Sequence, residues 1–204
     1  MVEQWLTGAW WRAVLLWSVV YISDYAFSVY NASLYRRGAH QYYEFEGSLE
    51  LTPQFQEDID NLRWFSTRFV RAFLFSNIIL SLVWWLAVEW AQWPETFLFA
   101  FGGMMLLEAA VHLRHIRLLV LFMQLTTGQG IEGKIYQSRW LGYQASGWEF
   151  IAFAGLCLLL SIAVGSWFIL GGAFMNAVTG VQHLRWGKQA LSQSNDEPQN
   201  TLGL

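Results

Sequence analysis

Long apolar stretches separated by charged segments dominate the pattern of this sequence. The clearest stretch runs from Phe150 to Val181, thirty-two residues without Asp, Glu, Lys, Arg or His. A helix of about 20 apolar residues crosses a hydrocarbon layer roughly 30 Å thick. The pattern therefore predicts an all-α integral membrane protein, with the lipid bilayer as its main partner.

We predict four transmembrane helices that form a single helical domain over residues 1–188. The expected spans cover about residues 12–35, 72–90, 96–115 and 149–172. The last apolar stretch is about ten residues longer than one span needs. It is therefore expected to be one tilted or kinked helix or, alternatively, two short helices that meet at Gly165-Ser166. One helix is favoured, because a turn in hydrocarbon would leave backbone groups without partners.

The distribution of basic residues predicts the orientation. Nine of the twelve Lys and Arg residues fall in the connections after the first and third spans. Cytoplasmic loops carry an excess of Lys and Arg. We therefore expect a multi-pass protein of the cell membrane, with both long connections inside and both termini outside.

Two polar segments lie outside the predicted spans. The connection 36–66 is expected to be a partly ordered cytoplasmic loop. Its residues 43–51 alternate apolar and acidic side chains around a Gly-Ser pair, which predicts a short β-hairpin. The polar composition of residues 189–204 predicts a disordered tail.

Composition narrows the class further. Hydrophobic residues make up 55% of the chain and charged residues 13%, which is typical of a membrane protein. A net charge of −3 gives no reason to expect a nucleic-acid partner. Cys157 is the only cysteine, so an intramolecular disulfide and a cysteine-based metal cluster are excluded.

Asp24 lies at the midpoint of the first predicted span. A carboxylate at the centre of a membrane helix costs about 2.5–3.5 kcal/mol on insertion scales, so it normally faces the interior of a bundle and has a partner. Asp24 is therefore a candidate ligand or proton site. The structural alternative is a neutral or hydrogen-bonded Asp24 that only fixes packing.

A second polar face lies on the third predicted span. Glu108, His112 and His115 are spaced i, i+4, i+7, which places them on one side of a helix. One carboxylate and two imidazoles can bind a divalent metal or relay protons. The structural alternative pairs Glu108 with His112 or an Arg and places His115 at the cytoplasmic interface. Arg114 and Arg117, which fall on the opposite side of the helix, lie at the same interface in that alternative. No cofactor is assigned, and Glu108, His112 and His115 are the metal candidates.

Haem is a further alternative, because two histidines on different helices can be its axial ligands. The available pair joins His112 or His115 to His183. The predicted topology places His183 at the opposite end of the bundle, which argues against haem.

The leading functional hypothesis is an intramembrane site for a proton or small cation, built from Asp24, Glu108, His112 and His115. It implies a subunit of a transport or channel-like assembly, either a homo-oligomer or a membrane complex, with the small residues of the last span as the contact face. One alternative is a non-catalytic membrane scaffold that recruits a partner through the 36–66 loop. Another is an intramembrane enzyme that acts on a lipid.

Overall fold

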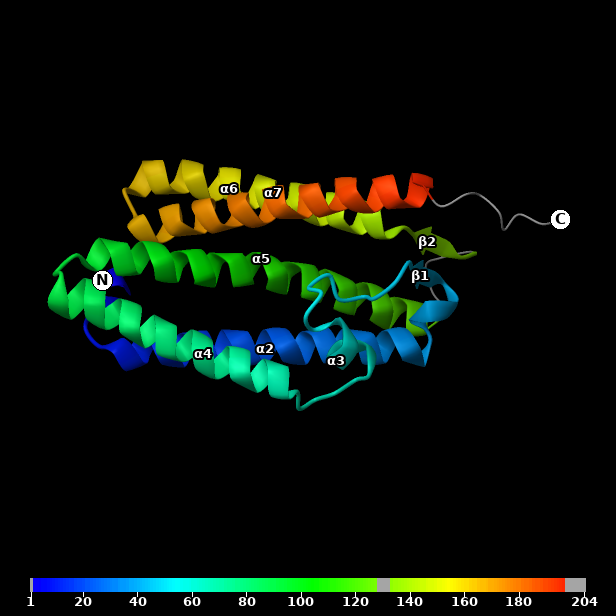
Figure 1. Ribbon diagram of the computed structural model, residues 1–204, viewed down its shortest axis with the longest axis horizontal. Coiled ribbons are helices and arrows are strands. Elements are labelled where there is room, and N and C mark those ends of the chain that lie inside the picture. The colour runs from blue at the N-terminus through cyan, green and yellow to red at the C-terminus, as the bar shows by residue number, and fades with distance from the viewer. Residues whose placement is uncertain (1, 128–132, 197–204) are drawn as a thin grey trace.

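The computed structural model describes residues 2–127 and 133–196, most of them in long helices (Figure 1). The elements are α1 (Val2–Thr7), α2 (Trp10–Arg37), the 3-10 turn η1 (Ala39–Gln41), β1 (Tyr43–Phe45), α3 (Gln56–Asp60), α4 (Thr67–Trp84), the π-helical segment η2 (Trp85–Trp90), α5 (Pro94–Thr126), β2 (Ile135–Gln137), α6 (Arg139–Val164) and α7 (Trp167–Asp196). By length and composition, four helices can cross a membrane: α2, α4 with η2, α5 and α6. The prediction of an all-α bundle with four such helices is confirmed, and a fifth long helix, α7, packs along α5 and α6.

The long apolar run is divided between two helices. The predicted single span 149–172 is wrong, because α6 ends at Val164 and α7 begins at Trp167. Between them Gly165 adopts a left-handed conformation with φ 66°. The turn satisfies its backbone, since the Gly165 N–H donates to the Ser161 carbonyl and the Ile169 N–H to the Ser166 hydroxyl. Neither helix is short, because α6 begins eleven residues before the apolar run.

Helix α7 packs along both α5 and α6, whereas α5 and α6 touch each other at few positions (Figure 1). Glycines allow this close approach. A Cβ on Gly102 would lie 2.0 Å from the Phe168 carbonyl oxygen, and one on Gly171 would lie 1.8 Å from the Phe99 carbonyl oxygen. The small residues expected to form an oligomer contact are thus used inside the chain.

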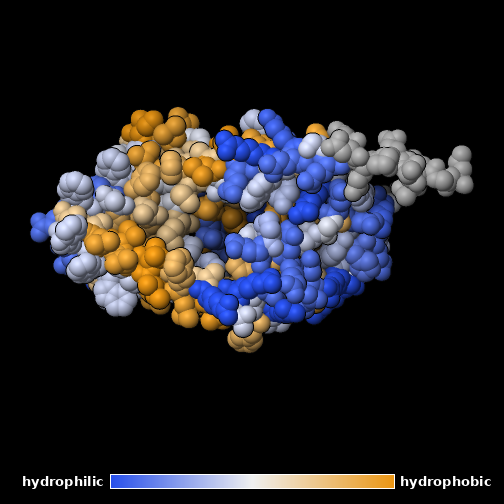
Figure 2. Space-filling model, viewed as in Figure 1, coloured by the Kyte–Doolittle hydropathy of each residue, from blue (hydrophilic) through white to orange (hydrophobic). Residues whose placement is uncertain are grey.

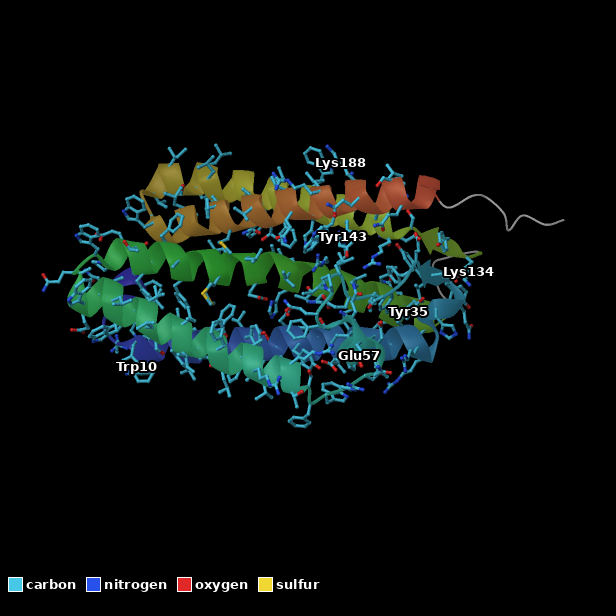
Figure 3. The ribbon with its side chains drawn as sticks, viewed as in Figure 1. Trp10, Tyr35, Glu57, Lys134, Tyr143 and Lys188 are labelled. Atoms are coloured by element: carbon cyan, nitrogen blue, oxygen red, sulfur yellow. The ribbon has the colours of Figure 1, made fainter. Side chains whose placement is uncertain are left out.

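The ends of the bundle differ in polarity. The space-filling view shows hydrophobic side chains gathered over one half of the bundle, beyond which lies a tip of paler residues, and hydrophilic side chains over the other half (Figure 2). Trp10 lies toward the apolar end and Lys134 at the polar end (Figure 3). Because α7 runs back beside α6, it ends at the polar end, opposite α1 (Figure 1). The prediction that both termini share one side is therefore wrong.

Because α7 runs back to the polar end, the difference in the number of Lys and Arg residues between the two ends is larger than predicted. Of the twelve Lys and Arg residues, Arg12 alone lies near the apolar end, and the other eleven lie toward the polar end. Residues 189–196 continue α7, so the predicted disordered tail is wrong for that part. Residues 197–204 lie outside the described part of the chain.

A small folded cap, which comprises residues 38–66 and β2, closes the polar end. The predicted hairpin within residues 43–51 is wrong, because β1 instead pairs in parallel with β2, with Tyr43 opposite Ile135 and Phe45 opposite Gln137. The connection 36–66 is packed onto the bundle. Ile59 of α3 is 1% exposed, and it packs with Tyr25 and Val29 of α2.

Exposed tryptophans mark the level of the apolar end. They include Trp10, Trp90, Trp93 and Trp167. Amphipathic rings favour the headgroup level. At about 1.5 Å per residue, Asp24 lies about 21 Å from the start of α2, and Glu108 lies about 21 Å from the start of α5. Both carboxyl groups therefore lie at similar depth within a hydrocarbon layer of about 30 Å.

Candidate functional site

Asp24 of α2 faces α5. Its Oδ1 atom lies 3.0 Å from Nε2 of His115, which is an ion-pair distance. His115 is 7% exposed, and the carboxylate is only partly exposed. The Ser28 hydroxyl is 3.4 Å from the same imidazole nitrogen, and the Asn31 amide donates to the His115 carbonyl oxygen at 3.1 Å. Side chains from three successive turns of α2 therefore contact His115 of α5.

His112 lies one turn before His115 on α5 and contacts Ser23 of α2. Its Nδ1 atom is 2.8 Å from the Glu108 carbonyl oxygen, which can only accept, so Nδ1 carries a proton. Its Nε2 atom is 2.8 Å from the Ser23 hydroxyl. That hydroxyl also lies 2.8 Å from the Val20 carbonyl oxygen. The Ser23 hydroxyl therefore bridges the His112 ring and the backbone of its own helix.

Three of the predicted residues come together as possible metal ligands. The ligand atoms of Asp24, Glu108 and His112 all lie within 4.8 Å of one another. The predicted metal set instead joined Glu108 and His112 to His115, which lies outside this group and pairs with Asp24. The residues fit a divalent ion, because metal-binding histidines commonly donate their second ring N–H to a backbone carbonyl, as His112 does. With bonds of about 2.0–2.2 Å, an ion would draw the three side chains closer together.

The carboxylates are poorly satisfied by the protein. Within the described residues, Asp24 Oδ1 and Glu108 Oε2 are buried atoms that accept no hydrogen bond. Asp24 Oδ1 is close to His115, but the contact lacks hydrogen-bond geometry. Removing an ion from water costs several kcal/mol unless it is paired and hydrogen-bonded. The arrangement therefore favours an added positive charge, either protons or a metal ion.

One cavity reaches this cluster, and a second cavity lies beside it under the cap. The deeper one, of about 300 Å³, is lined by Asp24, Glu108 and His115, among others. The second, of about 460 Å³, lies under the cap. Both are lined by five of the same residues: Ser28, Glu50, Ile59, Arg114 and His115. The two cavities therefore adjoin at these five residues, which mark a route from the cap toward the carboxylates of Asp24 and Glu108.

Sequence reasoning missed two charged groups of this route. Glu50 belongs to the cap and accepts a hydrogen bond from the Ser28 hydroxyl at 3.2 Å. Arg114 was expected on the opposite face of its helix, yet it lines the deeper cavity and donates to the Ser146 hydroxyl of α6 at 2.6 Å. The deeper cavity thus carries three carboxylates and one arginine. Arg114 could have been suspected from its place one residue before His115, but Glu50 gave no such signal.

His183 of α7 lines the same cavity as His115. The expectation that it lies at the far end of the bundle is wrong, because α7 runs back beside α6. The imidazole of His183 is 8% exposed, and it packs against the rings of Tyr143, Phe150 and Trp186. The depth argument against haem therefore fails. The aromatic packing of His183 nonetheless points to a role in the contact of α6 with α7.

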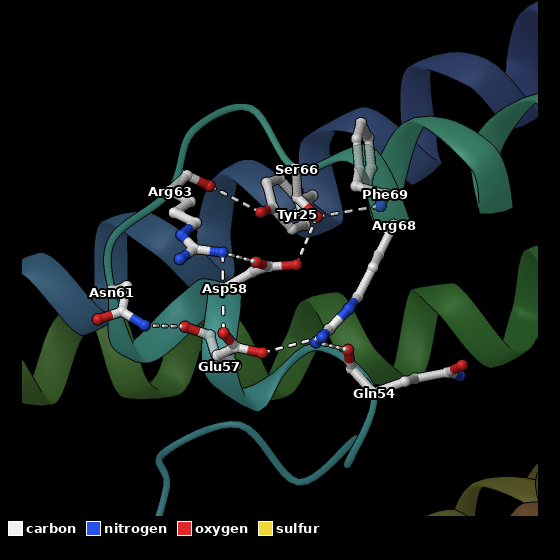
Figure 4. Close-up of polar contacts among 9 residues, drawn as sticks. All are labelled: Tyr25, Gln54, Glu57, Asp58, Asn61, Arg63, Ser66, Arg68 and Phe69. Carbon is white, nitrogen blue, oxygen red and sulfur yellow. Dashed lines mark hydrogen bonds and ion pairs between the residues drawn. The ribbon is translucent and has the colours of Figure 1, made fainter.

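A second buried acid lies in the cap and is fully satisfied (Figure 4). Asp58 is 3% exposed, accepts a hydrogen bond from the Ser66 hydroxyl, and pairs with Arg63 at 3.0 Å. Ser66 is also the N-cap of α4, because its hydroxyl accepts from the Phe69 N–H. The hydrogen bond from Ser66 is the main cause that lowers the pKa of Asp58 below its ordinary value.

Comparison with protein-family models, curated proteins and solved structures gave no match to this chain.

Proposed function

We propose that this protein binds a small cation, a proton or a divalent metal ion, at Asp24, Glu108, His112 and His115. The site would serve a transport or channel-like assembly in the cell membrane. One observation carries the proposal: the buried oxygens of Asp24 and Glu108 have no hydrogen-bond donor among the described residues and face a cavity rich in carboxylates. Intramembrane ionisable groups of this kind commonly mark ion pathways or proton relays.

The contacts support two charge states of the site. In the proton-loaded state, a proton on Glu108 or His112 neutralises the excess negative charge. In the metal-loaded state, Asp24, Glu108 and His112 Nε2 bind the ion, while the bond from His112 Nδ1 to the backbone holds the ring. Because the same atoms serve both states, metal binding releases protons.

The cap is packed onto the bundle beside this site. Leu49, Phe55, Ile59 and Leu62 pack toward α2, whereas Trp64 and Phe65 at the end of the cap are exposed by 55% and 93%. The cap also supplies Glu50 to the route that leads to the site. A role for the cap in closing the site accounts for both facts.

The test is cation binding by the purified full-length protein in detergent. Isothermal titration with Zn²⁺ and with Mn²⁺, run in two buffers of different ionisation enthalpy, gives both stoichiometry and proton release. We expect about one ion per chain with release of protons. Asp24→Asn and Glu108→Gln should lose this binding. Glu95→Gln is the matched control, since Glu95 lies on the same helix but is exposed at the apolar end.

If the protein binds neither Zn²⁺ nor Mn²⁺, a proton remains as the proposed ligand of the site. Infrared difference spectra between acidic and basic pH should then show a carboxyl band that is absent in Glu108→Gln. Metal binding that persists in both site variants, or the lack of any metal binding together with the lack of that band, would contradict the proposal.

A further inference from the structure

A groove open to the bilayer lies between α5 and α6. It encloses about 460 Å³. Its apolar walls come from both helices and include Ala110, Leu113, Phe153 and Leu156. The groove exists because α7 holds α5 and α6 together from one side, while these two helices touch each other at few positions. Leu113 and Leu156 are exposed by 59% and 52%, so the groove is accessible from the lipid.

Charged side chains close this groove toward the polar end. Arg114, Arg117 and Glu149 line the same cavity as the apolar residues. At about 1.5 Å per residue, Arg114 lies about 30 Å from the start of α5 and Arg117 about 35 Å. With a hydrocarbon layer of about 30 Å, these guanidinium groups reach the headgroup level of the leaflet at the polar end.

Both arginines keep donors for a ligand. Arg114 uses Nη1 for the Ser146 hydroxyl, and Arg117 uses Nη1 for the Glu149 carboxylate. A guanidinium has five N–H donors, and its planar fork matches a phosphate. The pair of Arg117 with Glu149 is well exposed at the surface, so it is weak and can be exchanged for another anion.

The space behind the arginines can hold a headgroup. Arg114, Arg117 and Glu149 line the groove and also the cavity under the cap. Of the acidic groups that line this cavity, Glu46 accepts from the Arg139 N–H and Glu50 accepts from the Ser28 hydroxyl, whereas Glu149 pairs with Arg117. The passage between α5 and α6 therefore combines an apolar channel, two cations at the headgroup level and a polar chamber.

We propose that this groove is a binding site for an anionic phospholipid. One acyl chain lies between α5 and α6, the phosphate binds Arg114 and Arg117, and the rest of the headgroup enters the chamber under the cap. Glu149 is the intramolecular competitor for the phosphate. This site uses neither Asp24 nor Glu108, although it shares Arg114 and the chamber under the cap with the route toward the cation site proposed above.

The experiment is native mass spectrometry of the full-length protein, freed of lipid in detergent and titrated with dioleoylphosphatidylglycerol or with dioleoylphosphatidylcholine. We expect the anionic lipid to bind more tightly than the zwitterionic one. Arg117→Gln should lower its affinity about five- to tenfold. Glu149→Gln should raise the affinity, because it removes the competitor. A bulky side chain in Ala152→Trp should block the channel.

Controls distinguish a built site from general attraction. Lys188→Gln removes an exposed charge at the same end and should change the affinity less than about twofold. Glycerol 3-phosphate, which has the anionic group without acyl chains, should not displace the lipid. The proposal is overturned if Lys188→Gln matches the loss in Arg117→Gln, if Glu149→Gln weakens binding, or if glycerol 3-phosphate competes fully. Melting temperatures of all variants establish that each is folded.

Discussion

The chain contains two acidic clusters with buried carboxylate oxygens, one in the cap and one in the bundle, and they differ in how well the protein satisfies them. Asp58 in the cap has a hydroxyl donor and an arginine, and all of its partners are close in sequence (Figure 4). Asp24 and Glu108 in the bundle have buried oxygens that no described group hydrogen-bonds. A satisfied buried acid stabilises a fold. An unsatisfied pair costs stability, and the cation proposed above would supply the missing charge.

The largest expected effect separates the clusters by ligand binding. Glu108→Gln should lower the affinity for a bound divalent ion about 100-fold, because it removes a ligand and a negative charge. Asp58→Asn should leave that affinity unchanged within about twofold. Titration calorimetry on both variants checks this. Equal losses in both would show that ion binding reports only the integrity of the fold.

The second largest expected effect is a difference between the two acidic clusters in their contribution to the free energy of unfolding. Asp58→Ala should lower the free energy of unfolding by about 2 kcal/mol, because Ser66 and Arg63 lose an ionised acceptor. Asp24→Asn should cost little, because the Asp24 side chain is 26% exposed and its contact with His115 lacks hydrogen-bond geometry. Thermal unfolding in detergent, followed by circular dichroism, measures both. A destabilised Asp24→Asn would assign Asp24 to packing.

A smaller effect is expected from Ser66, which serves both Asp58 and the first turn of α4. Ser66→Ala should cost about 1 kcal/mol, which is usual for loss of an N-cap hydroxyl. Ser81→Ala is a suitable control, because the Ser81 hydroxyl only bonds back to Asn77 within its own helix. If both variants unfold at the same temperature, the Asp58 cluster does not hold the start of α4.

The smallest effect concerns pH. The pKa of Asp58 is lowered in the folded protein, so its contribution to stability is complete above the ordinary pKa of about 4 and is lost as pH falls through the folded-state value. Between pH 7 and pH 5 this contribution should be constant. Below about pH 4 the wild type should lose stability relative to Asp58→Asn. Parallel melting curves of the two proteins down to pH 3 would contradict the assignment.

The sequence was sufficient to predict the class of the fold and the face that meets Asp24. The apolar runs predicted four spans, and helical spacing placed Glu108, His112 and His115 on one side of α5. The prediction of a single last helix failed at Gly165, where two helices meet, and the reason is physical. Counting only the charge-free run made two helices look too short, whereas both continue through charged residues beyond the hydrocarbon.

The cap could not be predicted in this way. The ion pair of Asp58 with Arg63 and the contact of Glu50 with Ser28 depend on how residues 38–66 fold over the bundle. β1 pairs with a segment some ninety residues away, so local alternation suggested the wrong partner. Periodicity reports which face of an element is apolar, but it does not report which distant segment covers that face.

The parallel pairing of β1 with β2 also has a consequence for biogenesis. Tyr43 emerges from the ribosome long before Ile135, and α4 and α5 must be inserted between them. Loop-closure entropy opposes the pairing until those helices have brought the two strands to the same end of the bundle. The cap therefore closes late in synthesis, and a nascent chain that lacks β2 leaves the entrance to its acidic interior open.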